Sequence, residues 1–246
     1  MKKTAVICAF LATLCASSRL PSTFTKCNRK QSDFNSCLRR AVQGALGRLT
    51  EPIKEVGLPN LDPLEVSELT IGAGASAVDF DQNFKHVKVF GFAKSNCSSC
   101  EMNFEEKTLR LECFSPEIRM EFEYEVEGRI LVVPLYGKGA GAVTLDRMKY
   151  VVDFSLEEYK KKGKKYFKAV DSDFAMEPEL VKIKIENLFD GDKALTDSVN
   201  RLANENWRLI FDDIRTNYQD ALAQISLAIF NKFLGKVSIS ELFGEE

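Results

Sequence analysis

The sequence predicts an α+β fold in which a highly curved antiparallel β-sheet wraps a long C-terminal helix, with a shorter helix before the sheet. Three observations predict it. Apolar residues recur at helical spacing after residue 33, alternate with charged residues over residues 64–188, and return to helical spacing from Leu195 onward. The 246 residues, 45% of them hydrophobic, are enough to bury a sizeable core.

The first residues are typical of a secretory leader. Met1-Lys2-Lys3 is basic, residues 4–15 form an apolar run, and small residues follow that run. We therefore expect a signal peptide over residues 1–18 and a single secreted domain over residues 19–246. A membrane anchor is the alternative, but no later segment supplies the ~20 apolar residues that a spanning helix needs.

The first helix is expected over residues 33–56, where Leu38, Val42 and Leu46 lie at helical spacing and Gly57 ends the pattern. Residues 58–63 then form a rigid connector, because its two prolines fix φ and disfavour helix in the residues before them.

Period-2 patterns predict the sheet. The clearest covers residues 117–127, where every apolar side chain points one way and every charge the other. Gly128 is expected to make the next turn, before a returning strand over residues 129–137. Further strands are expected over residues 84–92, 108–114, 148–156 and 181–185. Short polar turns between consecutive strands indicate an antiparallel meander.

The last helix is expected from Leu195 to Ile229, with Asp192 as its N-cap. At ~1.5 Å per residue it is about 50 Å long, and only an elongated sheet curled around it can cover its broad apolar stripe. The residues expected to share this hydrophobic interior are Ile210, Ile214, Tyr218 and Ile225 of the helix and Phe122, Tyr124 and Val132 of the strands.

The cysteines predict a disulfide-bonded domain. Removal of the leader leaves five, which allow at most two bridges and one free thiol in an oxidising compartment. Cys27 and Cys37 are close enough in sequence for a local bridge, and Cys113 is expected to pair with either Cys97 or Cys100. Asn96 begins an Asn-Cys-Ser sequon and is a candidate glycosylation site.

The residues argue against catalysis, metal binding and nucleic-acid binding. The formal charge of −2 gives no basic excess for phosphates. His86, the one histidine, lies mid-strand, and zinc lacks a second ligand pair. Gly-rich residues 72–74 and 137–141 lead into strands, so turns or close strand crossings are favoured over a phosphate loop. The lysines of residues 160–165 could contact anionic lipid, but a solvated hairpin tip is favoured.

Four stretches, in order along the chain, resemble the insect takeout and juvenile hormone binding protein family. They are the Cys27 and Cys37 pair, the connector Gly57-Leu58-Pro59-Asn60-Leu61-Asp62-Pro63-Leu64, the hairpin segments Tyr124-Glu125-Val126-Glu127-Gly128-Arg129-Ile130-Leu131 and Pro134-Leu135-Tyr136-Gly137-Lys138-Gly139, and the segments Asn187-Leu188-Phe189-Asp190-Gly191-Asp192 and Asn204-Glu205-Asn206-Trp207. No cysteine follows Cys113, whereas the hormone-carrier branch uses C-terminal cysteines, so the chain is nearer the takeout branch.

The resemblance implies a long helix in a curved antiparallel sheet, related to the tubular lipid-binding superfamily, with a tunnel that carries a small hydrophobic ligand without chemistry. We expect a monomeric secreted carrier of a terpenoid, a juvenile-hormone-like molecule or a fatty acid or ester, with no cofactor and without membrane contact. The alternative is a protein that binds amphipathic lipids at a membrane or microbial envelope. The expected ligand-binding residues are Phe122, Tyr124, Val132, Tyr136, Trp207, Ile210, Ile214 and Tyr218.

Overall fold

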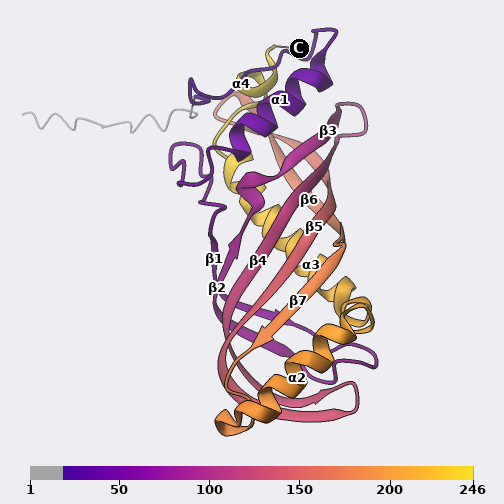
Figure 1. The fold of residues 1–246 in the computed structure, drawn as a ribbon. Coiled ribbons are helices and arrows are strands. Elements are labelled where there is room, and N and C mark those ends of the chain that lie inside the picture. Colours follow the sequence, from indigo (N-terminus) through magenta and orange to yellow (C-terminus); the bar gives the residue numbers. More distant parts are fainter. Residues whose placement is uncertain (1–18, 246) are drawn as a thin grey trace, which may run out of the picture.

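A curved antiparallel sheet wraps one long helix in the computed structural model, which describes residues 19–245 (Figure 1). The predicted signal peptide lies outside these residues. The strands are β1 (Leu64–Ile71), β2 (Gln82–Phe90), β3 (Asn96–Asn103), β4 (Thr108–Ile130), β5 (Val133–Lys161), β6 (Lys164–Glu177) and β7 (Leu180–Ile185). The helices are α1 (Phe34–Leu46), α2 (Lys193–Glu205), α3 (Trp207–Leu234) and α4 (Ile239–Phe243), with 3-10 turns η1 (Phe92–Lys94) and η2 (Phe189–Gly191).

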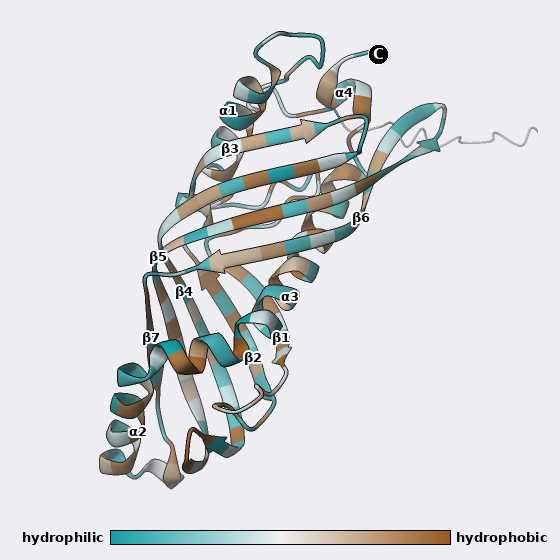
Figure 2. Ribbon diagram, turned by 90° about the vertical axis from the view of Figure 1, so that its right-hand side faces the viewer, coloured by the Kyte–Doolittle hydropathy of each residue, from teal (hydrophilic) through white to brown (hydrophobic). Residues whose placement is uncertain are grey.

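The sheet is the predicted antiparallel meander, built on two very long strands. β4 and β5 pair from Thr108 opposite Ser155 down to Ile130 opposite Val133. β2 and β3 both pair with the outer edge of β4, and β6 and β7 both pair with the outer edge of β5. β1 pairs with β2 and forms the edge strand on that side. Apolar and polar residues alternate along these strands (Figure 2), so one face can be buried against α3.

A one-residue break in the pairing halfway along β4 and β5 joins segments that the sequence pattern separates. Pairing steps from Ser115 opposite Met148 to Glu117 opposite Asp146, so the ladder skips Pro116 and Arg147. Proline has no N–H to donate to a ladder, and Arg147 takes a positive φ of 51°. The alternation of inward side chains changes phase here, which is why residues 108–114 and 117–127 read as two strands although they belong to one.

The predicted turn at Gly128 is wrong. β4 continues to Ile130, and the turn consists of Leu131 and Val132. Gly128 lies within the ladder opposite Leu135, where a Cβ would come within 2.7 Å of the Phe80 side chain. Glycine is therefore needed at this position for the close approach of Phe80 rather than for a reversal of the chain.

The first helix is shorter than predicted. α1 ends at Leu46, and residues 47–56 form turns instead of further helix. Pro52 cannot donate an N–H to a helix, and Ile53 pairs with Leu58 in an isolated β-bridge. The apolar spacing continues because Leu49 and Val56 are buried as separate turn residues.

The predicted final helix is two helices. Asn206, with φ −111° and ψ 23°, separates α2 from α3, and its side-chain Nδ2 donates to the Leu202 carbonyl oxygen at 2.8 Å. Such local bonds let asparagine compete with helical pairing. Asp192 caps α2 as predicted, since its side chain accepts from the N–H of Leu195. α3 alone fills the curve of the sheet, and α2 lies across one end (Figure 1).

Side-chain amides attach the helices to the sheet edges. Asn200 and Asn204 of α2 each accept from and donate to one backbone unit of β7, at Ile185 and Ile183. Asn231 of α3 does the same at Ala169 of β6, and Gln43 of α1 bonds the Cys97 N–H and the Ser95 carbonyl beside β3. These pairs satisfy backbone groups that a sheet edge otherwise leaves open.

Candidate functional site

Two apolar cavities lie end to end between α3 and the sheet. The α2-end chamber measures about 180 Å³ and is walled by β1, β2, β4, β5, β7, α2 and α3. The α1-end chamber measures about 320 Å³ and is walled by α1, β3 to β6 and the C-terminal half of α3. Both are lined by Leu64, Phe92, Leu222 and Ile225, so these four residues form the junction between them.

Five of the predicted ligand-binding residues line the α2-end chamber. Phe122 and Tyr124 come from β4, and Ile210, Ile214 and Tyr218 come from α3. They meet because inward residues of the strand alternate on one face while the helical residues recur at every turn or nearly so. Their role in ligand binding stays a prediction, but the structure brings them together on one wall.

Val132 and Tyr136 do not reach either chamber. Val132 is in the β4–β5 turn with 86% of its surface exposed, so its predicted interior position is wrong. Tyr136 lies opposite Glu127, and directly paired residues point to the same face of a sheet. Its side chain therefore faces outward, 49% exposed, with its ring 5.4 Å from that of Phe189.

Trp207 also lies outside the two chambers. It is the first residue of α3, and its partly buried ring packs beside Phe211 while the Arg208 guanidinium lies 4.6 Å from the ring centre. Trp207 follows the break at Asn206 directly and so stands at the N-terminal end of α3.

Few polar side chains line the α2-end chamber, and most of these have partners. The Tyr124 hydroxyl donates to the Glu186 carbonyl at 2.6 Å, and burial followed by the nearby Glu186 charge raises the pKa of Tyr124 to about 12. The Tyr218 hydroxyl donates to Gln82 Oε1 at 3.1 Å, and burial raises the pKa of Tyr218 well above its ordinary value. Both phenols therefore stay neutral and act as hydrogen-bonding groups.

The α1-end chamber was not predicted from the sequence. Its walls are almost wholly apolar and include Val42 and Leu46 of α1 and Phe230 of α3. The apolar stripe along residues 34–46 was the one feature of the sequence that pointed to this region, since the apolar face of an amphipathic helix packs on a buried apolar surface. Nothing in that stripe distinguishes a cavity wall from a packed core.

A loop of residues 72–81 closes over α3 beside the α2-end chamber. The Asp213 carboxylate accepts hydrogen bonds from the N–H groups of Ala75, Ser76, Ala77 and Val78, at 2.7–3.0 Å. No helix begins after Gly72-Ala73-Gly74, and the carbonyl oxygens of Gly72 and Ala73 accept hydrogen bonds from Asn217 Nδ2 of α3. Val78 and Phe80 of the loop line the chamber.

The second Gly-rich stretch is a close strand crossing, as predicted. A Cβ at Gly137 or Gly139 would lie within 3.0 Å of the backbone that follows β7, and one at Gly141 would lie 2.5 Å from the Phe122 ring. His86 is exposed on the outer face of β2, where its Nδ1 lies 3.0 Å from Glu123 Oε2.

Two disulfides hold the N-terminal region and β3. Cys27 pairs with Cys37, as predicted, and Cys97 rather than Cys100 pairs with Cys113. Cys100 is a buried free thiol on the wall of the α1-end chamber. Burial and then the neighbouring Glu101 charge raise its pKa to about 12. Asn96, the glycosylation candidate, is exposed at the start of β3.

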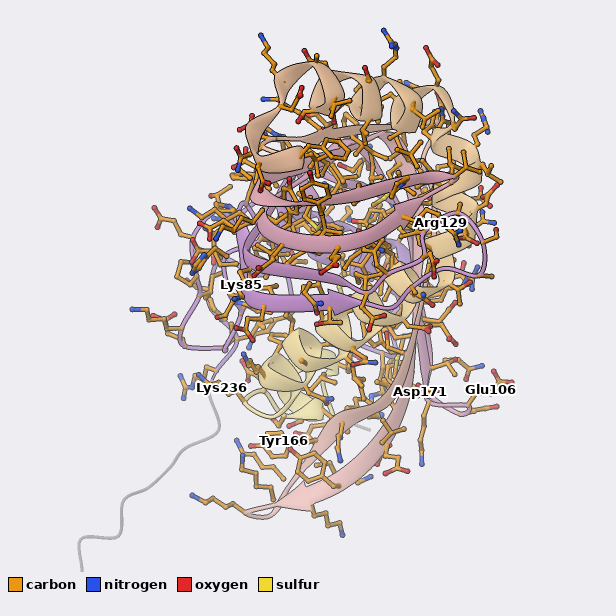
Figure 3. All side chains as sticks on the ribbon, turned by 90° about the horizontal axis from the view of Figure 1, so that it is seen from below. Lys85, Glu106, Arg129, Tyr166, Asp171 and Lys236 are labelled. Carbon is orange, nitrogen blue, oxygen red and sulfur yellow. A yellow bond between two sulfur atoms is a disulfide. The ribbon has the colours of Figure 1, made fainter. Side chains whose placement is uncertain are left out.

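The hairpin of β5 and β6 carries the lysine run at its tip. The turn falls at Lys162 and Gly163, as predicted, and the tip projects from the body of the molecule beside Tyr166 (Figure 3). Lys161 Nζ donates to the Gly235 carbonyl oxygen, and Lys165 Nζ lies 3.7 Å from Glu158 Oε2. Two of these lysines therefore interact with groups of the same chain.

Within residues 19–245 no three His, Cys, Asp or Glu side chains gather in a way that could hold a metal ion. Over the same residues, no helix has the length and apolar character needed to cross a bilayer.

Residues 5–244 match the family model described as haemolymph juvenile hormone binding protein. This chain belongs to that family. Its relatives in the family include the circadian clock-controlled protein daywake of Drosophila melanogaster, 23% identical over 239 residues that cover 94% of this chain and 91% of that protein. The daywake protein of Drosophila yakuba is 22% identical over the same coverage.

A solved structure shows the same fold. The crystal structure of Epiphyas postvittana Takeout 1 superposes with a TM-score of 0.78 at 21% identity, over 90% of this chain and all of that one. The predicted family and fold class, a curved antiparallel sheet around a long C-terminal helix with a short N-terminal helix, are thereby confirmed.

Proposed function

We propose that this protein is a secreted carrier that binds one small elongated hydrophobic molecule between α3 and the sheet and releases it unchanged. The observation that carries the proposal is the pair of adjoining apolar chambers, which share a junction and run along the same helix. Their combined size falls within the ~300–1,000 Å³ typical of small-molecule pockets. A tight core would fill such space with side chains.

The energetics of this space favour an extended apolar ligand. Each buried CH₂ group contributes about 0.8 kcal/mol, so a chain of ~15 carbons gains roughly 12 kcal/mol. Loss of translational and rotational freedom costs about 4 kcal/mol or more, so this burial alone supports an affinity up to the micromolar range. No strong ionic contact is required. Candidate ligands are terpenoids, juvenile-hormone-like molecules and fatty acids or esters.

Secretion is supported by three independent features. The first 18 residues carry the basic, apolar and small-residue pattern of a leader. Cys27–Cys37 and Cys97–Cys113 form disulfides, which persist in oxidising compartments. The family description names the haemolymph. The exposed Asn96 sequon fits glycosylation on the same route.

A displacement titration tests the carrier function. Secreted protein is delipidated, saturated with the uncharged fluorescent probe N-phenyl-1-naphthylamine, and titrated with terpenoids and fatty esters. We expect saturable probe binding that long apolar competitors reverse. Probe binding that never saturates, or that no competitor reverses up to its solubility limit, would contradict the proposal. Binding of the protein to anionic vesicles under those conditions would instead support the surface-lipid alternative.

A further inference from the structure

One polar atom on the wall of the α2-end chamber is left without a partner. Gln82 Nε2 is shielded from solvent and has no hydrogen-bond partner within residues 19–245. The other enclosed polar groups of that wall are occupied: Tyr124 bonds the Glu186 carbonyl, and Asn200 bonds the backbone at Ile185 and Thr196. Buried hydrogen-bond donors rarely lack a partner, because a donor that loses its hydration without gaining a hydrogen bond destabilises the protein.

The unpartnered donor is held in a fixed orientation. Gln82 opens β2 opposite Ile71, so its backbone is fixed by the sheet. Its Oε1 accepts from the Tyr218 hydroxyl of α3 at 3.1 Å, which leaves the Nε2 side of the amide free for another acceptor. Tyr218 and Gln82 thus form a polar corner, from β2 and α3, in a largely apolar chamber.

The charges around this corner indicate which acceptor fits. Among the described residues, neither chamber has a Lys, Arg or His side chain on its wall, and Glu125 lies on the wall of the α2-end chamber. A carboxylate bound there would lose its hydration without gaining a cation. A neutral acceptor oxygen, such as that of an ester or ketone carbonyl, loses far less hydration free energy when it is buried there.

We infer that Gln82 determines specificity, its Nε2 donating to a neutral carbonyl oxygen of the carried molecule and thereby favouring esters and ketones over free acids. This inference rests on the proposed carrier function. The bound molecule then has a defined direction. Its oxygen lies at the Gln82–Tyr218 corner, and its hydrocarbon tail passes the junction at Leu222 toward the almost wholly apolar α1-end chamber.

Three competitors that differ only in their head group test the inference. Methyl dodecanoate, dodecanoic acid at a pH where it is ionised, and tridecane are titrated against bound N-phenyl-1-naphthylamine. In the wild type we expect the ester to bind more tightly than the acid. Gln82→Met keeps the side-chain length and removes the donor. It is expected to weaken the ester roughly tenfold, about the value of one hydrogen bond, and to leave tridecane unchanged or slightly tighter.

Two further variants make the result specific. Tyr218→Phe releases Oε1, so the amide can turn, and a smaller loss of ester affinity is expected. Gln224→Met is the matched control, because Gln224 is exposed on α3, and it should change none of the three affinities. If Gln82→Met lowers all three affinities equally, or if the wild type prefers the ionised acid, the inference is wrong and the carrier function stands. Failure of the wild type to bind the probe saturably would overturn both.

Discussion

A single carboxylate, Asp213, fixes the loop of residues 72–81 against α3. It accepts four backbone N–H bonds and the Ser76 hydroxyl. A Cβ at Gly74 would come within 1.9 Å of Asp213 Oδ2, so glycine is needed for this approach. Partial burial alone would raise the pKa of Asp213, but the bonds from Val78, Ala77 and Ser76 hold it below its ordinary value.

Asp213→Asn is expected to lower the free energy of unfolding by about 2 kcal/mol at neutral pH, because charged acceptors form stronger hydrogen bonds than amides. A lowered pKa contributes stability above the unfolded-state value of ~3.9 and loses it as pH falls through the folded-state value. The difference between wild type and variant, measured by urea denaturation, should therefore shrink in acid. Asp212→Asn, one residue away and exposed, is the control. An equal effect of both variants would contradict this role.

Cys100 is predicted to be a silent thiol in the native protein. It is buried, and its raised pKa of about 12 leaves almost no thiolate at mildly alkaline pH. Iodoacetamide should leave the native protein unmodified and should alkylate one cysteine after denaturation without reductant. Peptide mapping should place that label on Cys100. Rapid labelling of the native protein, or a label on Cys97 or Cys113, would contradict the pairing and the burial.

At the scale of elements, the amide side chains of α2 close the β7 edge. Asn204 Oδ1 accepts from the Ile183 N–H at 2.9 Å, and its Nδ2 donates to the carbonyl of the same residue at 2.7 Å. Asn204→Ala removes both bonds and leaves both backbone groups open. We expect a loss of about 1–3 kcal/mol in unfolding free energy and faster hydrogen exchange at Ile183.

Arg201→Ala, exposed on the same helix, serves as the comparison for this variant. It should change neither the stability nor the exchange rate at Ile183 by a comparable amount. Unchanged exchange at Ile183 in Asn204→Ala would mean that the amide contact does not protect the edge.

Helices and strands could be predicted where apolar residues recur with the period of the element, every second residue in a strand and every three to four in a helix. Alternation along β7 and the helical stripe of α3 both follow from burying one face, so their residues could be assigned before the structure. Boundaries were less accessible. Asn206 interrupts the helix without interrupting its apolar spacing, and Gly128 suggested a turn although it accommodates Phe80.

At the scale of the whole molecule, α3 is one wall of two chambers, and Leu222 lies at their junction. The interior positions of Phe122 and Ile214 could be predicted, since each follows its own period. The α1-end chamber could not, because it is assembled from segments far apart in sequence whose apolar residues would look the same in a solid core. The outward position of Val132 depended on a turn three residues later than expected.

Leu222→Trp should narrow the junction between the two chambers and so weaken the binding of long ligands more than that of short ones. A chain that spans both chambers has to pass this residue, whereas one that fits a single chamber does not. Fluorescent probe displacement is expected to show a loss of at least tenfold for a long ester and little change for a short one, with the fold retained by circular dichroism. Ala228→Trp, exposed on the same helix, is the control. Equal losses for both chain lengths would contradict one continuous site.

Native mass spectrometry of the delipidated protein with a long-chain methyl ester tests the central claim most directly. A single internal site predicts one adduct per protein molecule that saturates and stays at one as the ester concentration rises. No adduct, or a ladder of adducts that grows with concentration, would contradict an internal carrier site between α3 and the sheet.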